Sequence, residues 1–379
     1  MKIAHIADPH LGYRAYNRIT SQGINRREAD VFQAFRQALA KVIEIDPDVI
    51  LIAGDMFHVV RPSNLTIQQT FREFTNLRNK TAAPVVIIGG NHDSPRSTDT
   101  GCILDLFANV PDVYVAHSEY VQVKLDNLHM SVFCLCHRAL PNLNSLKIEP
   151  DTSSKYNVLM VHGTLEGVIH NAYDLYEIRR DQVISDAWDY IAFGHYHVFE
   201  ELAPNAYYAG STEYTSTNIW SETKQPKGLI EYDLDEHKLV DFHKIDTRDV
   251  IDLRPIDAAG VVAGDLNTMI QRKVESIKGG YEDKIVRLVV ENLHRSVQAD
   301  LDFSLIRQVR SEALHFELQL RPPSRDGRTL TSASESGAAK PLEEEWDEFA
   351  KVYDIPAGVD RERFVDLGRD YLIKMAQSE

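Results

Sequence analysis

Short apolar runs alternate with helical periods through the first hundred residues of the chain. The pattern predicts buried strands at residues 2–8, 47–55 and 84–93, separated by helices at 25–46 and 64–80. The first helix carries one apolar stripe, formed by Phe32, Phe35, Leu39, Val42 and Ile43. A β-α-β-α-β order of this kind predicts a parallel sheet with helices packed on its faces.

The pattern then changes to mostly strands with short connections. The predicted strands are 157–163, 188–197, 206–210, 227–234 and 238–245. They predict a second sheet stacked on the first, so the expected fold class of residues 1–248 is α/β, a β-sandwich flanked by helices. Residues 249–322 alternate strand and helix and end on a strand, which predicts a small α+β domain.

The end of the chain differs in composition. Residues 323–341 are rich in Ser, Gly, Ala and Pro and predict a flexible linker. Helical periodicity returns over 342–379, with a break at DIPAG, residues 354–358. The apolar stripes of this tail are Trp346, Phe349 and Tyr353, and then Phe364, Leu367, Tyr371 and Met375. So short a segment can bury these side chains only by folding back or by docking on a partner.

Composition and charge narrow the class of protein. Hydrophobic residues make up 43 % and charged residues 26 % of the 379 residues, which is typical of globular proteins. The formal net charge of −16 argues against a generally basic nucleic-acid-binding surface. A polyanionic substrate would therefore need local basic patches or bound metal.

Cysteine usage and the apolar runs bear on location. Cys102, Cys134 and Cys136 provide neither a disulfide framework nor a four-thiolate zinc site, which fits a reducing cytosol. The start, MKIAHIADPHLG, lacks the basic region and long apolar stretch of a signal peptide. No uncharged apolar run approaches the about 18 residues of a membrane-spanning helix. A cytoplasmic protein is expected.

Five apolar runs end in polar side chains of the same few types. The residues are Asp8 and His10, then Asp55, then Asn91 and His92, then His162, and finally His195 and His197. A lone aspartate after a strand is usually a turn or cap residue, and a lone histidine is usually structural. Five such ends, four of them beside glycine (Gly54, Gly90, Gly163 and Gly194), are better explained as one site.

Carboxylate, amide and imidazole donors without thiolate suit a pair of borderline divalent ions such as Mn²⁺, with Fe²⁺ or Zn²⁺ as alternatives. Two ions about 3.5–4 Å apart could clamp the attacking and departing oxygens of an in-line phosphoryl displacement. One carboxylate must then bridge the ions, and the glycines fit turns where the backbone passes close to them. The pattern predicts a two-metal phosphoesterase site.

The series DPH, GD, GNHD, VHG and GHYH, in this order, resembles the calcineurin-like metallophosphoesterase superfamily. The resemblance implies two metal sites that share Asp55. Their ligands would be Asp8, His10, Asp55 and His197 for one ion, and Asp55, Asn91, His162 and His195 for the other. It also implies that His92 protonates the leaving oxygen or stabilises the transition state, and that Asp93 orients His92.

The superfamily contains phosphatases, cyclic-nucleotide phosphodiesterases, nucleotidases and DNA nucleases. The motif GDMFH with its His58, the opening DPHLGYRAYN and the layout of the chain are similar to the SbcD/Mre-type DNA double-strand-break repair nucleases. That resemblance implies a DNA nuclease with two Mn²⁺ ions, 3′→5′ exonuclease activity and single-strand endonuclease activity. His58 would help to position the phosphate or DNA backbone, or else simply pack against the sheet.

Basic residues follow three of the motifs: Arg14, Arg18, Arg26 and Arg27, then Arg61, then Arg96. Any one arginine fits a solvated face, but a group around the metals is better explained as contacts to DNA backbone phosphates. The α+β domain is also basic, and DNA contact and plain solubility explain its charge equally well. Nothing indicates readout of base edges, so sequence-independent DNA binding is expected.

The resemblance also implies partners. An ABC-type, SMC-like ATPase of the repair complex would bind the tail through Trp346, Phe349, Tyr353, Phe364, Leu367 and Tyr371. A helical pair packed on its own catalytic domain is the alternative. The first two helices would form a homodimer, and the protein would work near the nucleoid in a prokaryotic cytosol.

Two other functions remain open. One is a phosphodiesterase or phosphatase for small nucleotides or phosphoproteins, against which the α+β domain and the tail count. The other is a DNA-tethering scaffold with a vestigial site, against which the complete ligand set and His92 count.

Overall fold

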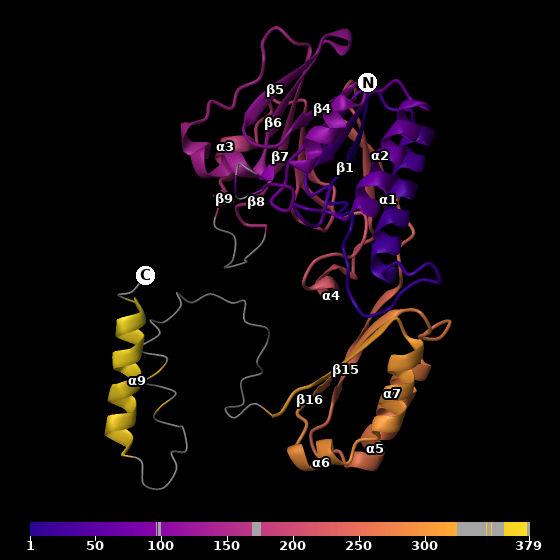
Figure 1. Cartoon of the computed structure of the whole chain (residues 1–379), viewed down its shortest axis with the longest axis vertical. Helices are drawn as coiled ribbons and strands as arrows, with labels where there is room; N and C mark the ends of the chain where they lie inside the picture. Colours follow the sequence, from indigo (N-terminus) through magenta and orange to yellow (C-terminus); the bar gives the residue numbers. More distant parts are fainter. Residues whose placement is uncertain are drawn as a thin grey trace. The chain divides into compact units, whose positions relative to one another are not determined.

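Two stacked six-stranded sheets form the body of the first 245 residues (Figure 1). The first sheet has the order β14-β13-β1-β2-β3-β4, and β1 to β4 run parallel. Its strands are β1 (Lys2–Ile6), β2 (Val49–Ala53), β3 (Val85–Ile88), β4 (Val113–Ala116), β13 (Gly228–Asp233) and β14 (Lys238–Lys244). In this computed structural model, the described residues are 1–95, 97, 100–168, 176–323, 346, 350 and 360–376, with side chains through 369.

The second sheet has the order β11-β12-β10-β7-β6-β5. Its strands are β5 (Tyr120–Leu125), β6 (Met130–Leu135), β7 (Tyr156–His162), β10 (Tyr190–Gly194), β11 (Glu200–Ala203) and β12 (Ala206–Tyr208). Alternate residues of the two sheets meet in a buried layer that includes Leu51, Val86, Met160 and Tyr190. The expected α/β sandwich is confirmed.

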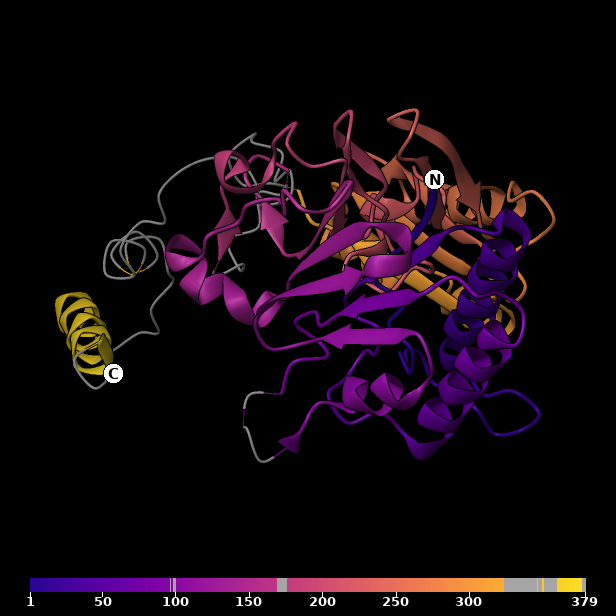
Figure 2. The same ribbon diagram turned by 90° about the horizontal axis from the view of Figure 1, so that it is seen from above.

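Helices cover the outer face of each sheet. On the first sheet lie α1 (Arg26–Ile45), α2 (Asn64–Arg78) and η2 (Ile103–Asn109), and Figure 2 shows α1 and α2 in indigo along one side of the sheets. On the second lie η4 (His137–Ser145) and α3 (Arg180–Val183). Smaller elements are η3 (Asp126–Leu128) and the pair β8 (Thr164–Leu165) and β9 (Glu177–Ile178).

Helix α1 begins where the sequence provides a cap. The side chain of Asn25 accepts hydrogen bonds from Arg27 N (3.0 Å) and Glu28 N (3.3 Å), which satisfies two of the free N–H groups of the first turn. The predicted stripe is buried at Phe35, Leu39 and Val42, but Ile43 is 36 % exposed. The apolar face of α1 is therefore wider than the sheet covers.

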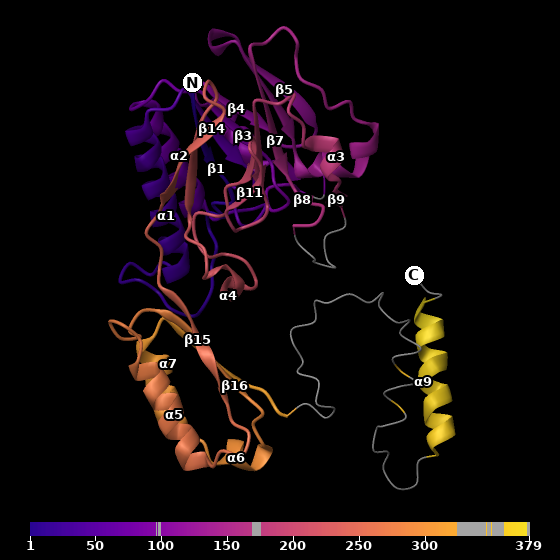
Figure 3. The ribbon, with the colours of Figure 1, turned by 180° about the vertical axis from the view of Figure 1, so that it is seen from behind.

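One strand assignment from the sequence is wrong. Residues 227–245 were expected in the second sheet, but β13 pairs antiparallel with β1 and β14 pairs with β13 (Figure 3). The reason is that β1 would otherwise be an open edge of the first sheet, and the β13-β14 hairpin covers that edge. The second sheet instead gains β5 and β11 at its two ends.

A three-stranded parallel sheet follows, with the order β15-β16-β17. Its elements are β15 (Val250–Asp257), α5 (Ala263–Glu275), β16 (Ile285–Glu291), α6 (Arg295–Ala299), α7 (Phe303–Glu312) and β17 (His315–Leu320). These helices share one buried apolar cluster with the sheet. Helix α7 begins at Phe303 because Asp302 caps it, accepting a hydrogen bond from Ser304 N (2.8 Å).

Short helix α4 (Ile219–Glu222) lies between the two large sheets and β15 in Figures 1 and 3. Its Trp220 packs in a buried cluster with Tyr214, Ile285 and Leu314. The guanidinium group of Arg287 lies 4.8 Å from the centre of the Trp220 ring. The connection between the large sheets and the small one is thus a packed interface rather than a free linker.

The chain separates into two compact units, residues 1–325 and 326–379. In the second unit, α9 (Arg361–Ala376) carries Phe364, whose ring centre lies 5.3 Å from that of Trp346. Trp346 Nε1 donates to the carbonyl oxygen of Val365 (2.9 Å). Leu367 is 58 % exposed. Phe349, Tyr353 and the side chain of Tyr371 lie outside the described residues.

Two further observations concern the sequence predictions. All three cysteines are free and buried. In the part of the chain that the structure describes, no helix has the length and apolarity that crossing a membrane requires. The predicted domain boundaries at residues 248, 322 and 341 stay predictions.

Candidate metal centre

The polar strand ends meet at one edge of the sandwich. Parallel strands place their carboxyl ends together, so the residues after β1, β2 and β3 lie side by side, as do those after β7 and β10. Stacking of the two sheets then brings both sets into one cluster. The structure brings together all seven predicted ligands: Asp8, His10, Asp55, Asn91, His162, His195 and His197.

Two groups within this cluster could each hold a metal ion. One group is Asp8, His10 and His197, and the other is Asp55, His162 and His195. Asn91 Oδ1 joins the second group, at 3.1 Å from His162 Nε2 and 3.0 Å from His195 Nδ1.

Asp55, a member of the second group, also lies close to the first. Its Oδ2 is 3.7 Å from His10 Nε2 and 3.4 Å from His162 Nε2. This position fits the bridging carboxylate that the sequence pattern requires.

The backbone is strained at these positions. Four residues of the cluster have positive φ angles, which residues other than glycine rarely adopt: Asp8 (φ 49°), His10 (φ 47°), Asp55 (φ 47°) and His195 (φ 99°). Each such residue costs about 1–3 kcal/mol and persists only where its surroundings impose it. The same turns aim the four side chains into the cluster.

Two glycines make the close packing feasible. Gly54 has φ +87°, and a Cβ atom there would lie 2.1 Å from His162 Nδ1. A Cβ atom on Gly90 would lie 2.1 Å from Asp55 Oδ1 and 2.5 Å from Asp55 N. Any larger residue at either position would displace a predicted ligand.

The buried carboxylates of Asp8 and Asp55 dominate the electrostatics of the cluster. Burial, assisted by the charge of Asp55, raises the pKa of Asp8 to about 8. His162 is also buried, yet the charges of Asp55 and Asp8 outweigh the burial and raise its pKa to about 9. The pKa of Asp55 is lowered despite its burial, because His162 attracts its negative charge.

The donor set fits divalent cations. The Nε2 atoms of His10 and His197 lie 3.0 Å apart, so at most one of them carries a hydrogen. Burial lowers the pKa of His10 to about 3 and holds the pKa of His197 below its ordinary value, which keeps both rings neutral with lone pairs available. Neutral imidazoles beside buried carboxylates match the ligands of Mn²⁺, Fe²⁺ or Zn²⁺.

His92 lies against this cluster without belonging to either group. Its backbone N–H donates to Asp55 Oδ1 (2.8 Å), and its ring meets His10 edge to face at 4.8 Å. Its Nδ1 donates to the carbonyl oxygen of His58 (2.7 Å). The hydrogen bond at Nδ1 directs Nε2 away from His58 and fixes the ring orientation.

The expected role of Asp93 does not match its contacts. Asp93 is fully buried and accepts hydrogen bonds from the backbone N–H groups of Met56 (3.1 Å), Phe57 (3.0 Å) and Gly90 (3.1 Å). It therefore ties the loop after β2 to the loop after β3. The carbonyl of His58, not this carboxylate, orients His92.

His58 lies in the site rather than against the sheet. Its ring stacks on His92 at 5.1 Å, and its Nδ1 is 3.4 Å from His10 Nδ1. Tyr13 meets the same ring edge to face at 4.9 Å. Together with His10 and His92, His58 forms a third group of nitrogen donors.

The predicted DNA-contacting arginines have different environments. Arg27 is 1 % exposed, and its guanidinium binds Asp30, Glu213 and the carbonyl of Tyr214, which does not favour phosphate contact.

Arg18 donates to carbonyl oxygens at the end of α7, and Arg26 pairs with Asp283 (3.0 Å), so both join the large sheets to the small one. Arg14 pairs with Glu28 but is 59 % exposed, Arg61 is exposed, and Arg96 lies outside the described residues.

The sequence analysis did not identify three residues that lie near the predicted ligands. Glu222 and Lys227 form a buried ion pair behind His197, and the ring of His137 lies 6.3 Å from that of His195. Glu222 and Lys227 come from the segment SETKQPKG, which resembles any charged surface loop. His137 follows an apolar run, as the predicted ligands do, and this signal could have identified it.

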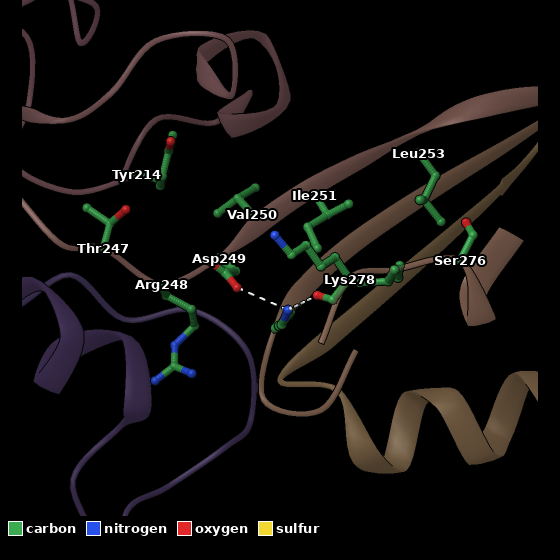
Figure 4. Close-up of a pocket in the computed structure, with 11 residues that line it drawn as sticks. Tyr214, Thr247, Arg248, Asp249, Val250, Ile251, Leu253, Ser276 and Lys278 are labelled. Atoms are coloured by element: carbon green, nitrogen blue, oxygen red, sulfur yellow. Dashed lines mark hydrogen bonds and ion pairs between the residues drawn. The ribbon is translucent and has the colours of Figure 1, made fainter. Parts of the chain in front are cut away.

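A separate pocket of about 440 Å³ lies at the start of the small sheet (Figure 4). Tyr214 and Thr247 line one side of it, and Val250, Ile251 and Leu253 of β15 line the other. In this pocket Lys284 pairs with Asp249 (3.1 Å), so one of the cations of the small domain is neutralised internally. The pocket shares no lining residue with the predicted ligands.

The chain is 28 % identical over 258 residues to the DNA double-strand break repair protein Mre11 of Methanocaldococcus jannaschii, covering 65 % of this chain and 66 % of that one. It is 26 % identical over 298 residues to the SbcD component of the SbcCD nuclease of Staphylococcus saprophyticus, covering 73 % and 75 %. Against Mre11 of Archaeoglobus fulgidus the identity is 31 %, covering 56 % and 50 %.

The chain thus spans just under two thirds, or less, of the length of these archaeal relatives. Among solved structures, purple acid phosphatase PPD1 from yellow lupin has a TM-score of 0.32 and 15 % identity, covering 53 % of this chain and 38 % of that one, a likeness too low to bear on function. Residues 1–199, more than half of the chain, match the calcineurin-like phosphoesterase family. The chain belongs to the calcineurin-like phosphoesterase family.

Proposed function

We propose that this protein is a two-metal phosphodiesterase that cleaves DNA ends during double-strand break repair. The observation that carries the proposal is the cluster of seven oxygen and nitrogen donors with His92 beside it. The family uses a dinuclear metal site. The names of the relatives, a double-strand break repair protein and a component of a nuclease, support DNA as the substrate.

Asp8, His10 and His197 would hold one ion, and Asn91, His162 and His195 the other, with Asp55 serving both. Two such ions supply Lewis-acid stabilisation of phosphoryl oxygens and acidify a nucleophilic water. Mn²⁺ suits this mixture of imidazole, amide and carboxylate better than softer metals do.

The side chains of the chain itself do the remaining work. His92, fixed at Nδ1 by the carbonyl of His58, presents Nε2 for proton transfer to the departing oxygen. Asp93 keeps the loops of Asp55 and Asn91 together through backbone hydrogen bonds. His58, stacked on His92, is positioned to contact a phosphate of the substrate.

DNA is a better substrate for this chain than a small nucleotide. The small sheet with its helices packs against the body through α4 and Arg18, an addition that a small substrate does not require. Because the net charge is −16, attraction of DNA would depend on the ions and on exposed cations such as Arg14 and Arg61. Sequence-independent 3′→5′ exonuclease and single-strand endonuclease activities are part of the proposal.

The proposal includes two protein partners. An ABC-type ATPase would bind the tail, where Leu367 remains 58 % exposed. A second copy of the chain would cover α1 and α2, whose exposed apolar residues include Ile43, Leu65 and Phe71. A strictly monomeric mass at micromolar concentration in light scattering would contradict this dimer. We propose the prokaryotic cytosol, near the nucleoid, as the location.

Cleavage of end-labelled duplex, hairpin and single-stranded DNA with Mn²⁺, Mg²⁺ or a chelator tests the function. Cyclic nucleotides and phosphopeptides serve as competing substrates in parallel reactions. We expect Mn²⁺-dependent cleavage of DNA and little turnover of the small substrates. Faster hydrolysis of the small substrates would favour the phosphatase alternative, and DNA binding without any cleavage would favour the scaffold.

A further inference from the structure

A buried ion pair lies on the Nδ1 side of the His197 ring. Glu222 ends α4 and Lys227 precedes β13, and each is 3 % exposed. The ammonium of Lys227 donates to Glu222 Oε2, to the carbonyl oxygen of His197 (2.6 Å) and to Ser211 Oγ (2.9 Å). This group therefore ties the backbone of His197 to the end of α4.

One oxygen of the pair lacks a hydrogen-bond donor. Within the described part of the chain, Glu222 Oε1 has no partner, although it is buried. It lies 3.8 Å from His197 Nδ1, and Thr215 Oγ1 lies 3.5 Å from the same nitrogen. A buried acceptor without a donor is destabilising, so its place beside a ring nitrogen requires an explanation.

The carboxylate is held rigidly in this place. Trp220, two residues earlier in α4, is packed with Ile285 and Leu314 from the small sheet and its neighbouring turn. Lys227 fixes Glu222 from the other direction. The position of Oε1 is therefore set before any ligand enters the site.

We propose that Glu222 is a positioning residue for His197. It keeps the ring hydrogen on Nδ1 and so directs the Nε2 lone pair at the centre shared with His10. The inference rests on the proposed function, because His197 is a metal ligand only there. Imidazole ligands usually donate their second N–H to a carboxylate or carbonyl, which fixes tautomer and orientation.

A neighbouring ligand has the same arrangement. His162 Nδ1 donates to the carbonyl of Ala53 (2.9 Å), while its Nε2 faces Asn91 and Asp55. His197 would follow this pattern with Glu222 in place of the carbonyl. The difference is that a carboxylate adds negative charge, which strengthens the ring as a donor to a cation.

Two double variants of the full chain test the role. Glu222→Leu with Lys227→Met and Glu222→Gln with Lys227→Met both remove the ion pair without leaving one buried charge unpaired. Thr215 Oγ1 is present in both variants, but only the second keeps a side-chain oxygen at position 222 that can accept from His197 Nδ1. After removal of metal, Mn²⁺ binding is measured by calorimetry. We expect the leucine variant to lose about 10- to 100-fold in affinity for one of two ions, and the glutamine variant to recover most of that loss.

Equal Mn²⁺ affinities in the two double variants would overturn the inference. Glu213→Gln is the matched control, because Glu213 is a buried carboxylate (1 % exposed) paired with Arg27 and not with a predicted ligand. It should lower the melting temperature without changing Mn²⁺ affinity. If it weakens Mn²⁺ binding as much as the leucine variant does, the effect is general destabilisation and the inference is wrong.

A second measurement does not depend on the folding of variants. Long-range ¹H–¹⁵N spectra of the native chain loaded with diamagnetic Zn²⁺ report the tautomer of each imidazole ring. Hydrogen on Nδ1 of His197 supports the inference, and hydrogen on Nε2 overturns it. A native chain that binds no divalent ion would overturn the proposed function as well. If the native chain binds two ions but does not cut DNA, only the proposal that DNA is the substrate is refuted.

Discussion

His5 should make the stability of the sandwich sensitive to acid. It is fully buried between the two sheets, where its Nδ1 lies 3.0 Å from the hydroxyl of Tyr190. Burial lowers its pKa to about 3, against 6.5 in an unfolded chain. Below pH 6.5 the unfolded chain therefore takes up a proton that the folded chain does not. The stabilisation is complete above pH 6.5 and is lost as the pH falls from there toward 3.

The magnitude follows from the two pKa values. At pH 5.5 the loss is RT ln(1 + 10), about 1.4 kcal/mol, and at pH 4.5 it is about 2.7 kcal/mol. His5→Phe keeps the aromatic contact with Tyr190 but cannot titrate. Between pH 7.5 and 5.5 the unfolding free energy of both proteins should decrease. The decrease should be about 1.4 kcal/mol smaller for His5→Phe than for the native chain. Urea unfolding with chelator present measures both falls.

Comparing the unfolding free energy of one protein at two pH values removes the effects of the substitution that do not depend on protonation. The unpartnered Tyr190 hydroxyl in the variant lowers stability equally at both values, so it cancels. His237→Asn is the control, since His237 is exposed and its substitution should leave the fall unchanged. The reasoning is refuted if His5→Phe loses as much stability between pH 7.5 and 5.5 as the native chain.

Three further predictions concern the site and the tail. His92→Ala should retain Mn²⁺ binding but cleave about 10²–10⁴-fold more slowly, and a variant that binds no Mn²⁺ by calorimetry would contradict its assignment. Asp55→Asn should weaken the binding of both metal ions, whereas His197→Ala should weaken mainly the binding of one. If anomalous scattering shows that both variants lose the two ions equally, this division of ligands is excluded. Deletion of residues 342–379 should leave Mn²⁺-dependent cleavage of single-stranded DNA nearly intact while abolishing co-purification with the proposed ATPase partner. Full co-purification of the truncated chain would show that the tail is not the docking element.

The site residues at the strand ends could be predicted because each follows a recognisable local sequence pattern. An apolar run followed by Asp, Asn or His identifies one corner of the site, and parallel strands bring the corners together. The cluster of predicted ligands therefore follows from short-range signals at Asp8, Asp55 and His162 together with one rule of topology.

Features that depend on distant pairings were not predictable. Whether β13 joins β1 or the second sheet depends on which edge remains open, and residues 228–233 carry no mark of that choice. Arg27 has the sequence context of a surface cation, but Glu213, far along the chain, makes it a buried one. Asp93 follows His92 directly, yet its side chain turns to backbone N–H groups of two loops.

The wide separation of the predicted ligands along the chain has a consequence for folding. His10 and His197 are 187 residues apart but touch in the folded protein, and Asp8 binds the backbone of His195 across the same interval. A growing chain that has made only β1 to β4 of the first sheet would offer Asp8, His10, Asp55 and Asn91 without the histidines of the second sheet. Contacts so distant in sequence form slowly, because a long loop must close first. An ion bound only by the finished site would stabilise the pairing of the two sheets by mass action, so a higher concentration of free metal in the cell would increase the folded fraction of newly made chains.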